Sequence, residues 1–235
     1  MSSPAPLKID VFPDATAVAV AAARELAQAA RDAVAARGRF LLAVSGGRTP
    51  WQMLRALAGE SVPWGQVHVF QVDERVAPAG DPDRNLTHLR ESLLSHAPLP
   101  PEQIHPMPVE AADLDAGAAA YVQTMAALAG TPPVLDLVHL GLGADGHTAS
   151  LIPDDPVLQV HDRDVALTGL YQNRRRMTLT YPLINRARRI LWVVTGAEKA
   201  PMLRRLRDGD ASIPGGAVVQ AHAVVLADAP AAAAL

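Results

Sequence analysis

The sequence has no cysteine, few aromatic residues and no excess of positive charge. Without cysteine, its 235 residues cannot form disulfide bonds, thiolate metal sites or a cysteine nucleophile. Aromatic residues make up only 4% of the chain, so we expect an aliphatic core built largely from alanine, valine and leucine. A formal net charge of -3 argues against general binding to nucleic acid or to a membrane surface, because both need a positive excess.

Long hydrophobic runs are also missing. No apolar segment approaches the roughly 20 residues needed to span a bilayer, and the start, MSSPAPLKID, lacks the pattern of a secretory signal. We therefore expect a soluble, cytoplasmic protein. The length fits one large domain, and no long linker or internal repeat divides the chain, so we predict a single domain over residues 1–235.

Short apolar segments alternate with helical patterns along the chain. This alternation predicts an α/β fold, a Rossmann-like and mostly parallel sheet with helices on both faces. Near-continuous apolar runs, typical of strands buried on both faces, lie at residues 40–44, 67–72, 135–140 and 190–194. Helical patterns lie at residues 16–36, 51–58, 86–96, 114–129 and 199–207.

Polar or glycine-rich segments follow directly after these four predicted strands. They are SGGRTP at 45–50, DER at 73–75, GLGADGHT at 141–148 and TGAEK at 195–199. Ligands of open parallel sheets bind just outside the carboxyl ends of the strands. We therefore expect the four segments to meet in one crevice that holds the active site.

The first segment has the composition of a phosphate-binding turn. Two adjacent glycines, Gly46 and Gly47, let the backbone after Ser45 approach a ligand closely. Thr49 can cap the following helix, whose free N–H groups would bind phosphate. An ordinary strand-to-helix turn has the same composition, so this segment alone leaves both interpretations open.

Arg75 and Lys199 are candidates for contacts with an anionic ligand. Arginine offers a planar fork of donors that suits phosphate, and an acid beside it, such as Asp73, could hold that fork in place. The alternative for Arg75 is a weak surface ion pair. Lys199 is one of only two lysines in the chain, which favours a ligand contact over a solvated side chain.

His147 is the strongest candidate for acid–base chemistry. It lies in a carboxyl-end loop where no apolar stripe requires it. We expect it at the start of a helix, whose positive end would favour the neutral imidazole that a general base needs. The candidate catalytic residues are His147 and Asp145, with water as the nucleophile. Backbone N–H groups of the Gly143–His147 loop would stabilise the charge on the carbonyl oxygen.

A competing interpretation is dinucleotide binding, because residues 141–146 match a G-x-G-x-x-G string. Asp145 would place a negative charge beside the pyrophosphate, and Pro153 would shorten the following helix. The string also lies mid-chain rather than in the first βα turn, so it is weak evidence. We expect no cofactor, and the scattered histidines predict no metal site.

Five segments together resemble one known family. They are LLAVSGGRTP at 41–50, FQVDERVAP at 70–78, LVHLGLGADGHTASLIP at 137–153, MTLTYPLINRARRILWVVTGAEKA at 177–200 and, weakly, ADA at 227–229. They are similar to segments of the glucosamine-6-phosphate isomerase/6-phosphogluconolactonase family, in the family's order. GLGADGHTASLIP is the most specific of them and resembles the lactonases of the oxidative pentose phosphate pathway.

The resemblance implies hydrolysis of 6-phospho-D-glucono-1,5-lactone, with His147 as the catalytic base. Arg75 and Lys199 would contact the phosphate or neighbouring polar groups, and residues 45–49 would hold the phosphate. Where family members often have Asp-Ser-Asn, this chain has Arg84 as the middle residue, a cation that could touch substrate or line the rim. The candidate substrate-binding residues are Ser45, Gly46, Gly47, Thr49, Asp73, Arg75, Arg84, Gly143 and Lys199.

Two other functions remain open. One is an amino-sugar phosphate deaminase or isomerase that uses Asp73 for proton transfer, although Arg75 and the intact histidine loop favour the lactonase. The other is a sugar-phosphate sensor that binds without turnover. In each case we expect a small phosphorylated sugar as the partner, with no nucleic acid or membrane partner, and a monomer or weak homo-oligomer.

Overall fold

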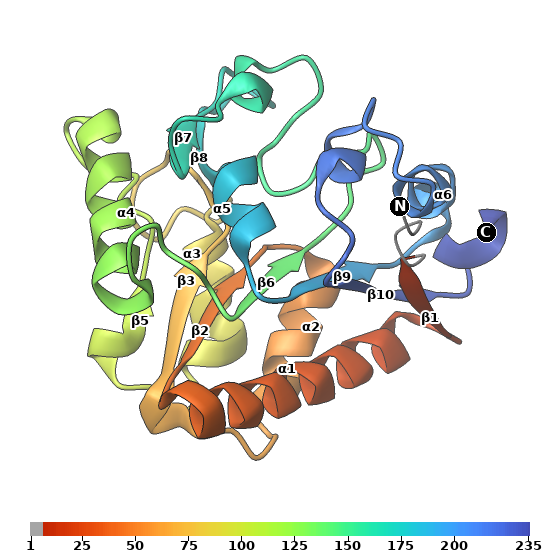
Figure 1. Cartoon of the computed structure of the whole chain (residues 1–235), viewed down its shortest axis with the longest axis horizontal. Helices are drawn as coiled ribbons and strands as arrows, with labels where there is room; N and C mark the ends of the chain where they lie inside the picture. Colours follow the sequence, from red (N-terminus) through yellow and green to blue (C-terminus); the bar gives the residue numbers. More distant parts are fainter. Residues whose placement is uncertain (1–6) are drawn as a thin grey trace, which may run out of the picture.

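The computed structural model describes residues 7–235, which form a seven-stranded parallel sheet and a three-stranded antiparallel sheet (Figure 1). The large sheet has the order β1-β10-β9-β6-β2-β3-β5. Its strands are β1 Lys8–Phe12, β2 Phe40–Val44, β3 Val67–Gln71, β5 Ile104–His105, β6 Leu137–Leu140, β9 Ile190–Val194 and β10 Ala223–Asp228. The small sheet, in the order β4-β8-β7, consists of β4 Asp73–Arg75, β8 Arg176–Leu179 and β7 Val165–Leu167.

Helices connect the strands and cover both faces of the large sheet. They are α1 Ala15–Arg37, α2 Arg48–Leu57, α3 Asn85–Leu89 with a π-helical turn Arg90–Leu94, α4 Leu114–Ala129, α5 Tyr181–Arg186 and α6 Ala200–Arg207. In Figure 1, α1 and α2 lie below the sheet, and α5 and α6 lie above it. The predicted Rossmann-like, mostly parallel α/β fold is therefore confirmed.

Most of the predicted elements are present at or near their expected positions. Strands 40–44 and 190–194 and helix 114–129 match β2, β9 and α4 at both ends. The other two strands and helices 16–36 and 199–207 end within two residues of β3, β6, α1 and α6. Helix 51–58 instead begins three residues early, at Arg48, because the glycine turn leads directly into α2.

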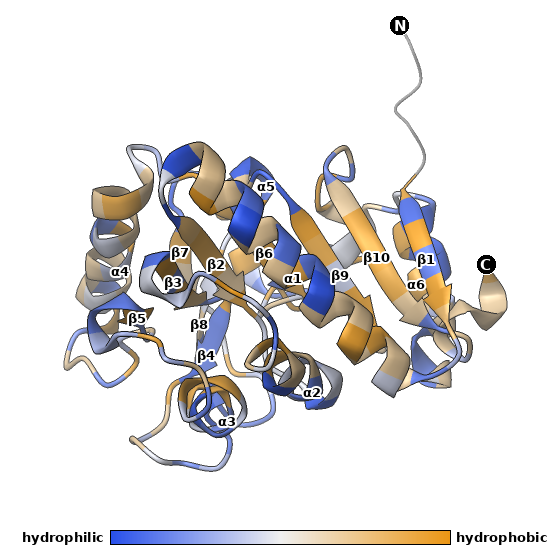
Figure 2. Cartoon of the chain, turned by 90° about the horizontal axis from the view of Figure 1, so that it is seen from below, coloured by the Kyte–Doolittle hydropathy of each residue, from blue (hydrophilic) through white to orange (hydrophobic). Residues whose placement is uncertain are grey.

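The apolar runs belong to central strands that divide their side chains between two cores. In β2, Leu42 packs with α1 and α2, whereas Leu41 and Ala43 pack on the opposite face with residues of α4 and α5. Successive side chains of a strand point to opposite faces, so a strand covered on both sides is apolar throughout. Figure 2 shows this pattern as orange central strands beside helices with hydrophilic outer residues.

The small sheet extends the fold beyond the end of β3. β4 follows β3 after a single residue and pairs with β8 in an antiparallel register that places Arg75 opposite Arg176. Both sheets contribute to one hydrophobic core, which contains Trp192 from β9 and Met177 from β8. This shared core supports the single-domain interpretation, which stays a prediction. The monomer or weak homo-oligomer also stays a prediction.

None of the helices within residues 7–235 is both long enough and apolar enough to cross a membrane.

Candidate active site

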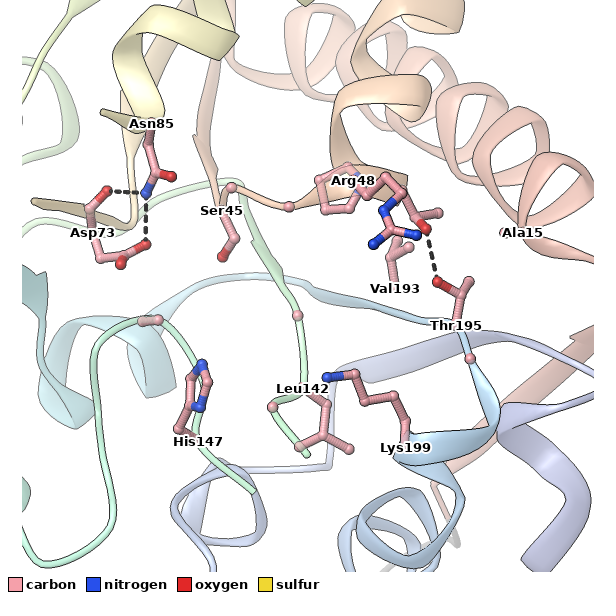
Figure 3. A pocket seen from close by; sticks show the side chains of 18 of the residues that line it. Ala15, Ser45, Arg48, Asp73, Asn85, Leu142, His147, Val193, Thr195 and Lys199 are labelled. Carbon is pink, nitrogen blue, oxygen red and sulfur yellow. Dashed lines mark hydrogen bonds between the residues drawn. The ribbon is translucent and has the colours of Figure 1, made fainter. Parts of the chain in front are cut away.

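A pocket of about 540 Å³ lies at the carboxyl ends of β2, β6 and β9. Nine of the candidate residues line it: Ser45, Gly46, Gly47, Thr49, Asp73, Arg75, Gly143, His147 and Lys199. Figure 3 shows His147 and Asp73 at one end of this pocket and Lys199 and Arg48 toward the other. The four predicted loops therefore converge, as expected from parallel strands that end at one edge.

A buried histidine, His139, holds the glycine-rich loop after β2 in place through two hydrogen bonds. The Ser45 N–H donates to Nδ1 of His139 (3.2 Å), and the Ser45 hydroxyl donates to the His139 carbonyl (3.0 Å). Burial lowers the pKa of His139 to about 3, so the imidazole is a neutral acceptor at ordinary pH. A Cβ atom at Gly46 would overlap the Asn85 carboxamide, so only glycine permits this close approach.

Thr49 does not cap the following helix, and that expectation is wrong. Gly47 precedes α2 with a φ of 132°, and no side chain caps the helix. The start of α2 therefore presents backbone N–H groups to the pocket without a side-chain acceptor. The Thr49 hydroxyl instead lies 2.7 Å from the Thr195 hydroxyl and ties the loop after β2 to the loop after β9.

His147 lies on a tight turn and not at the start of a helix, which corrects a second expectation. Gly143 donates to the His147 carbonyl (2.8 Å) and Gly146 donates to the Gly143 carbonyl (3.0 Å). Residues 144–155 form turns and an isolated bridge, with no helix. The helix-dipole argument for His147 therefore fails. So does dinucleotide binding, because no helix begins in residues 144–155 to bind the pyrophosphate.

Asp145 stands behind His147 and orients its imidazole. Nδ1 of His147 lies 2.5 Å from Oδ1 of Asp145, which also accepts from the His147 backbone N–H (3.1 Å). Burial disfavours the carboxylate, but hydrogen bonds and charge from His147 outweigh it and lower the pKa of Asp145. An ionised Asp145 accepts from Nδ1–H, which leaves Nε2 with its lone pair. Asp145 itself does not line the pocket.

In the loop around His147, where backbone donors are expected, three N–H groups already have acceptors. The N–H groups of Gly143, Gly146 and His147 already donate to the His147 carbonyl, the Gly143 carbonyl and the Asp145 carboxylate, respectively. A side chain at Gly143 would also overlap the His147 ring, which explains the glycine there. The Ala144 N–H donates in none of these hydrogen bonds, so backbone donation from this loop to a charged carbonyl oxygen stays a prediction.

Arg84 lies outside the pocket, which overturns its assignment as a substrate-binding residue. Its side chain is 3% exposed. Its Nε lies 3.2 Å from Glu74 Oε2, and its Nη1 lies 2.5 Å from Glu110 Oε1 and donates to the Ala77 carbonyl (2.9 Å). Two carboxylates therefore neutralise the cation that the sequence placed near the site, and Arg84 is a structural residue.

Glu74, whose role the sequence left open, fixes β4 to the start of α3. Its carboxylate is fully buried and accepts from the backbone N–H groups of Asn85 and Leu86 (2.8 Å each). These are the first two residues of α3, so the carboxylate caps that helix. The cap places Asn85 in the wall of the pocket, where its amide donates to the carbonyl (3.0 Å) and carboxylate (3.3 Å) of Asp73.

Arg176 is a pocket residue that the sequence analysis missed. It lies directly across the small sheet from Arg75, is only 5% exposed, and lines the same pocket. Burial, together with the charge of Arg75, lowers the pKa of Arg176. Within residues 7–235, neither guanidinium lies within ion-pair distance of a carboxylate. Like charges facing each other across a sheet repel, so the pair favours a bound anion.

Lys199 belongs to the opposite end of the pocket. It ends a short 3-10 turn after β9, and the preceding Gly196 N–H donates to both carboxylate oxygens of Asp228 (3.0 and 3.1 Å). Asp228 therefore fixes the turn that carries the lysine. In Figure 3 the ammonium group of Lys199 points toward the interior of the pocket, near Leu142.

Comparison with known proteins identifies the family of this chain. Residues 13–227 match the model of the family described as glucosamine-6-phosphate isomerases/6-phosphogluconolactonase. The chain belongs to this family. A relative named 6-phosphogluconolactonase from Synechocystis sp. is 44% identical over 171 residues, 71% of each chain. Another of that name, from Mycobacterium tuberculosis, is 38% identical over 97% of this chain and 98% of its own.

A solved structure titled 6-phosphogluconolactonase from Trypanosoma cruzi has the same fold. It superposes with a TM-score of 0.88 at 26% identity and covers all of this chain and 98% of that one. The isomerase/lactonase family membership is thus consistent with the observed fold. Among the described residues, no group of three or more His, Asp or Glu side chains could hold a metal ion.

Proposed function

We propose that the protein hydrolyses 6-phospho-D-glucono-1,5-lactone to 6-phospho-D-gluconate. The observation that carries this proposal is one pocket with the Asp145-backed His147 at one end and Lys199 toward the other. A phosphorylated lactone needs both features, a base near its carbonyl carbon and a cation near its phosphate. The names of the relatives support the same substrate.

His147 is the base in the proposed mechanism. Its Nε2 takes a proton from water as the water oxygen forms a bond to C1 of the lactone. When the tetrahedral intermediate collapses, the bond between C1 and the ring oxygen breaks, and the imidazolium returns the proton to that oxygen. The products are a carboxyl group at C1 and a hydroxyl at C5. General acid–base catalysis of this kind contributes about 10²- to 10⁴-fold in rate.

Arg75 and Arg176 are the proposed partners of the charge that develops on the C1 oxygen. The lactone carbonyl is neutral, whereas the intermediate and the product carboxylate are negative at this position. Two guanidiniums without a carboxylate partner among the described residues stabilise that new charge more than the ground state. This assignment moves Arg75 from the phosphate to the reacting carbon.

The phosphate is assigned to Lys199 and the start of α2. The lysine supplies a positive charge, and the residues after Gly47 supply backbone donors at an uncapped helix start. Because the phosphate is remote from C1, its contacts hold the lactone in register without taking part in the chemistry.

A direct assay tests the proposed activity. The lactone is generated in situ by enzymatic oxidation of glucose 6-phosphate, and its disappearance is measured with and without the protein, because the lactone also opens spontaneously. We expect hydrolysis well above the blank. Release of ammonia from glucosamine 6-phosphate would favour the deaminase, and stabilisation by the phosphosugar without turnover would favour the sensor. Either result, with no lactone hydrolysis above the blank, contradicts the proposal.

Lys199→Met tests the phosphate assignment. A lost charge-assisted contact to phosphate is expected to raise KM for the phosphorylated lactone by about 10- to 100-fold. Hydrolysis of the unphosphorylated glucono-1,5-lactone should stay close to the parent level. Lys8→Met is the matched control, because Lys8 is the only other lysine and pairs with Asp10 on β1, outside the pocket. An equal loss on both lactones would contradict the assignment.

A further inference from the structure

Tyr171 lies on a tight turn next to the candidate catalytic pair. The turn has two central residues, Gln172 and Asn173, both with positive φ (50° and 63°), and Tyr171 pairs with Arg174 across it. The Tyr171 N–H donates to the Arg174 carbonyl (3.0 Å), and the Arg174 N–H returns the bond (3.2 Å). Such a turn holds its flanking residues in a defined register, so the tyrosine projects from a fixed base.

The side chain of Tyr171 contacts three charged or titratable groups of the site. Its hydroxyl donates to Oδ2 of Asp145 (3.2 Å), the oxygen that His147 does not use. Its ring meets the His147 imidazole edge to face, with centroids 5.9 Å apart at 64°. The Arg176 guanidinium carbon lies 4.8 Å from the centre of the same ring.

We propose that Tyr171 is a positioning residue that holds the Asp145–His147 pair and the Arg176 guanidinium in register on one side of the pocket. This inference rests on the proposed lactone hydrolysis and extends it to a residue that does not itself line the pocket but contacts two residues that do.

The first part of the argument concerns the Asp145 carboxylate. The side chain is 39% exposed, so water competes for its oxygens, and the hydrogen bonds from its own turn, donated by the ring and backbone N–H of His147, reach only Oδ1. With Oδ1 on His147 and Oδ2 on Tyr171, both oxygens are restrained and the plane of the carboxylate is set. The imidazole that donates to Oδ1 is then oriented as well. Burial and the charge of Asp145 raise the pKa of Tyr171, which keeps the phenol protonated as a donor.

The second part concerns Arg176. Its Nε has no hydrogen-bond partner among the described residues, and one Nη donates to Gln172 Oε1 (3.0 Å) on the same turn. The tyrosine ring face attracts the cation without using any of its donors. The remaining N–H groups therefore stay available to an anion in the pocket.

The sequence carried no signal for this residue. Tyr171 is 26 residues beyond Asp145 and lies in a segment with no strand or helix pattern, between Leu170 and three arginines. Only the fold brings the turn over the histidine loop, through β7 and β8 of the small sheet.

Tyr171→Phe removes the hydroxyl and keeps the ring. We expect kcat for the lactone to fall by about 3- to 10-fold, the effect of one hydrogen bond to a charged group, with KM within about twofold of the parent. Loss of a donor to the carboxylate raises the pKa of Asp145. A more basic Asp145 stabilises the His147 imidazolium more strongly, so the acidic limb of the pH profile of kcat should move to higher pH, by about half a unit to one unit.

Tyr171→Leu removes the ring as well. We expect the same loss in kcat and pH shift, and in addition a rise in the inhibition constant of the product 6-phosphogluconate by about 3- to 10-fold, because Arg176 loses its support. Leu170→Ala is the matched control, since Leu170 directly precedes the turn and is 77% exposed. All three variants should keep the thermal unfolding midpoint of the parent within a few degrees.

If Tyr171→Phe keeps both the parental kcat and the parental acidic limb, the inference is overturned. Parallel losses in Leu170→Ala would also overturn it, because they would show a general effect of the turn. Both results are distinct from failure of the proposed function, in which the parent protein itself shows no lactone hydrolysis above the blank.

Discussion

His147→Ala is expected to lower kcat for the phosphorylated lactone by about 10²- to 10⁴-fold, the range that a general base contributes. KM should change little, because the phosphate contacts assigned to Lys199 and α2 remain. The imidazole lines the pocket and is held at 2.5 Å by Asp145, so its removal leaves water without a base. The measurement is hydrolysis of the lactone generated in situ, corrected for the spontaneous rate.

His161→Ala is the control for this prediction, because His161 is exposed and lies outside the pocket. It should retain the parental kcat. A His147→Ala variant that hydrolyses the lactone within a few-fold of the parent would remove His147 from the mechanism, even if the lactonase activity itself were present.

Glu74→Gln is expected to destabilise the fold by about 3 to 5 kcal/mol, the cost of removing the buried partner of a buried cation. Glu74 is fully buried, lies 3.2 Å from Nε of Arg84 and caps α3. The neutral amide cannot balance the charge of Arg84. Its NH₂ group would also replace one carboxylate oxygen, and an NH₂ group cannot accept from the backbone N–H groups of α3. Urea unfolding, monitored by circular dichroism, measures the decrease in the free energy of unfolding.

Glu110→Gln is the matched comparison, because Glu110 pairs with the same arginine but its side chain is 51% exposed. This substitution should lower the free energy of unfolding by at most about 1 kcal/mol, since water replaces an exposed partner. Replacing both members of the buried pair, as Glu74→Leu with Arg84→Met, should recover part of the stability. Equal costs for Glu74→Gln and Glu110→Gln would show that the buried pair has no special role.

The sequence predicted four of the five inner strands of the large sheet, all but β10, and several long helices, because their signals are local. An apolar run such as β9 contains its own evidence, since a strand covered on both faces needs apolar side chains at every position. Strands at the edges were missed for the same reason. β1 begins with Lys8 and has exposed residues, and β5 has only two residues, so neither forms an apolar run.

The sequence by itself also determined that the polar loops meet in one pocket. This follows from order alone, because parallel strands of one sheet end at the same edge and the loops after them must lie together. Nine of eleven candidate residues line the pocket, and the tenth, Asp145, stands directly behind His147.

Only the tertiary structure decided what each charged side chain contacts. Arg84 and Arg176 are both arginines near polar loops, yet Arg84 is paired with Glu74 and Glu110, whereas Arg176 faces the pocket beside Arg75 without a carboxylate partner in the described chain. Tyr171 reaches Asp145 because β7 and β8 carry its turn across the site. Hydrophobic periodicity is set by neighbours along the chain, but the partner of a charge is set by residues distant in sequence, and that pairing exists only once the sheets have formed.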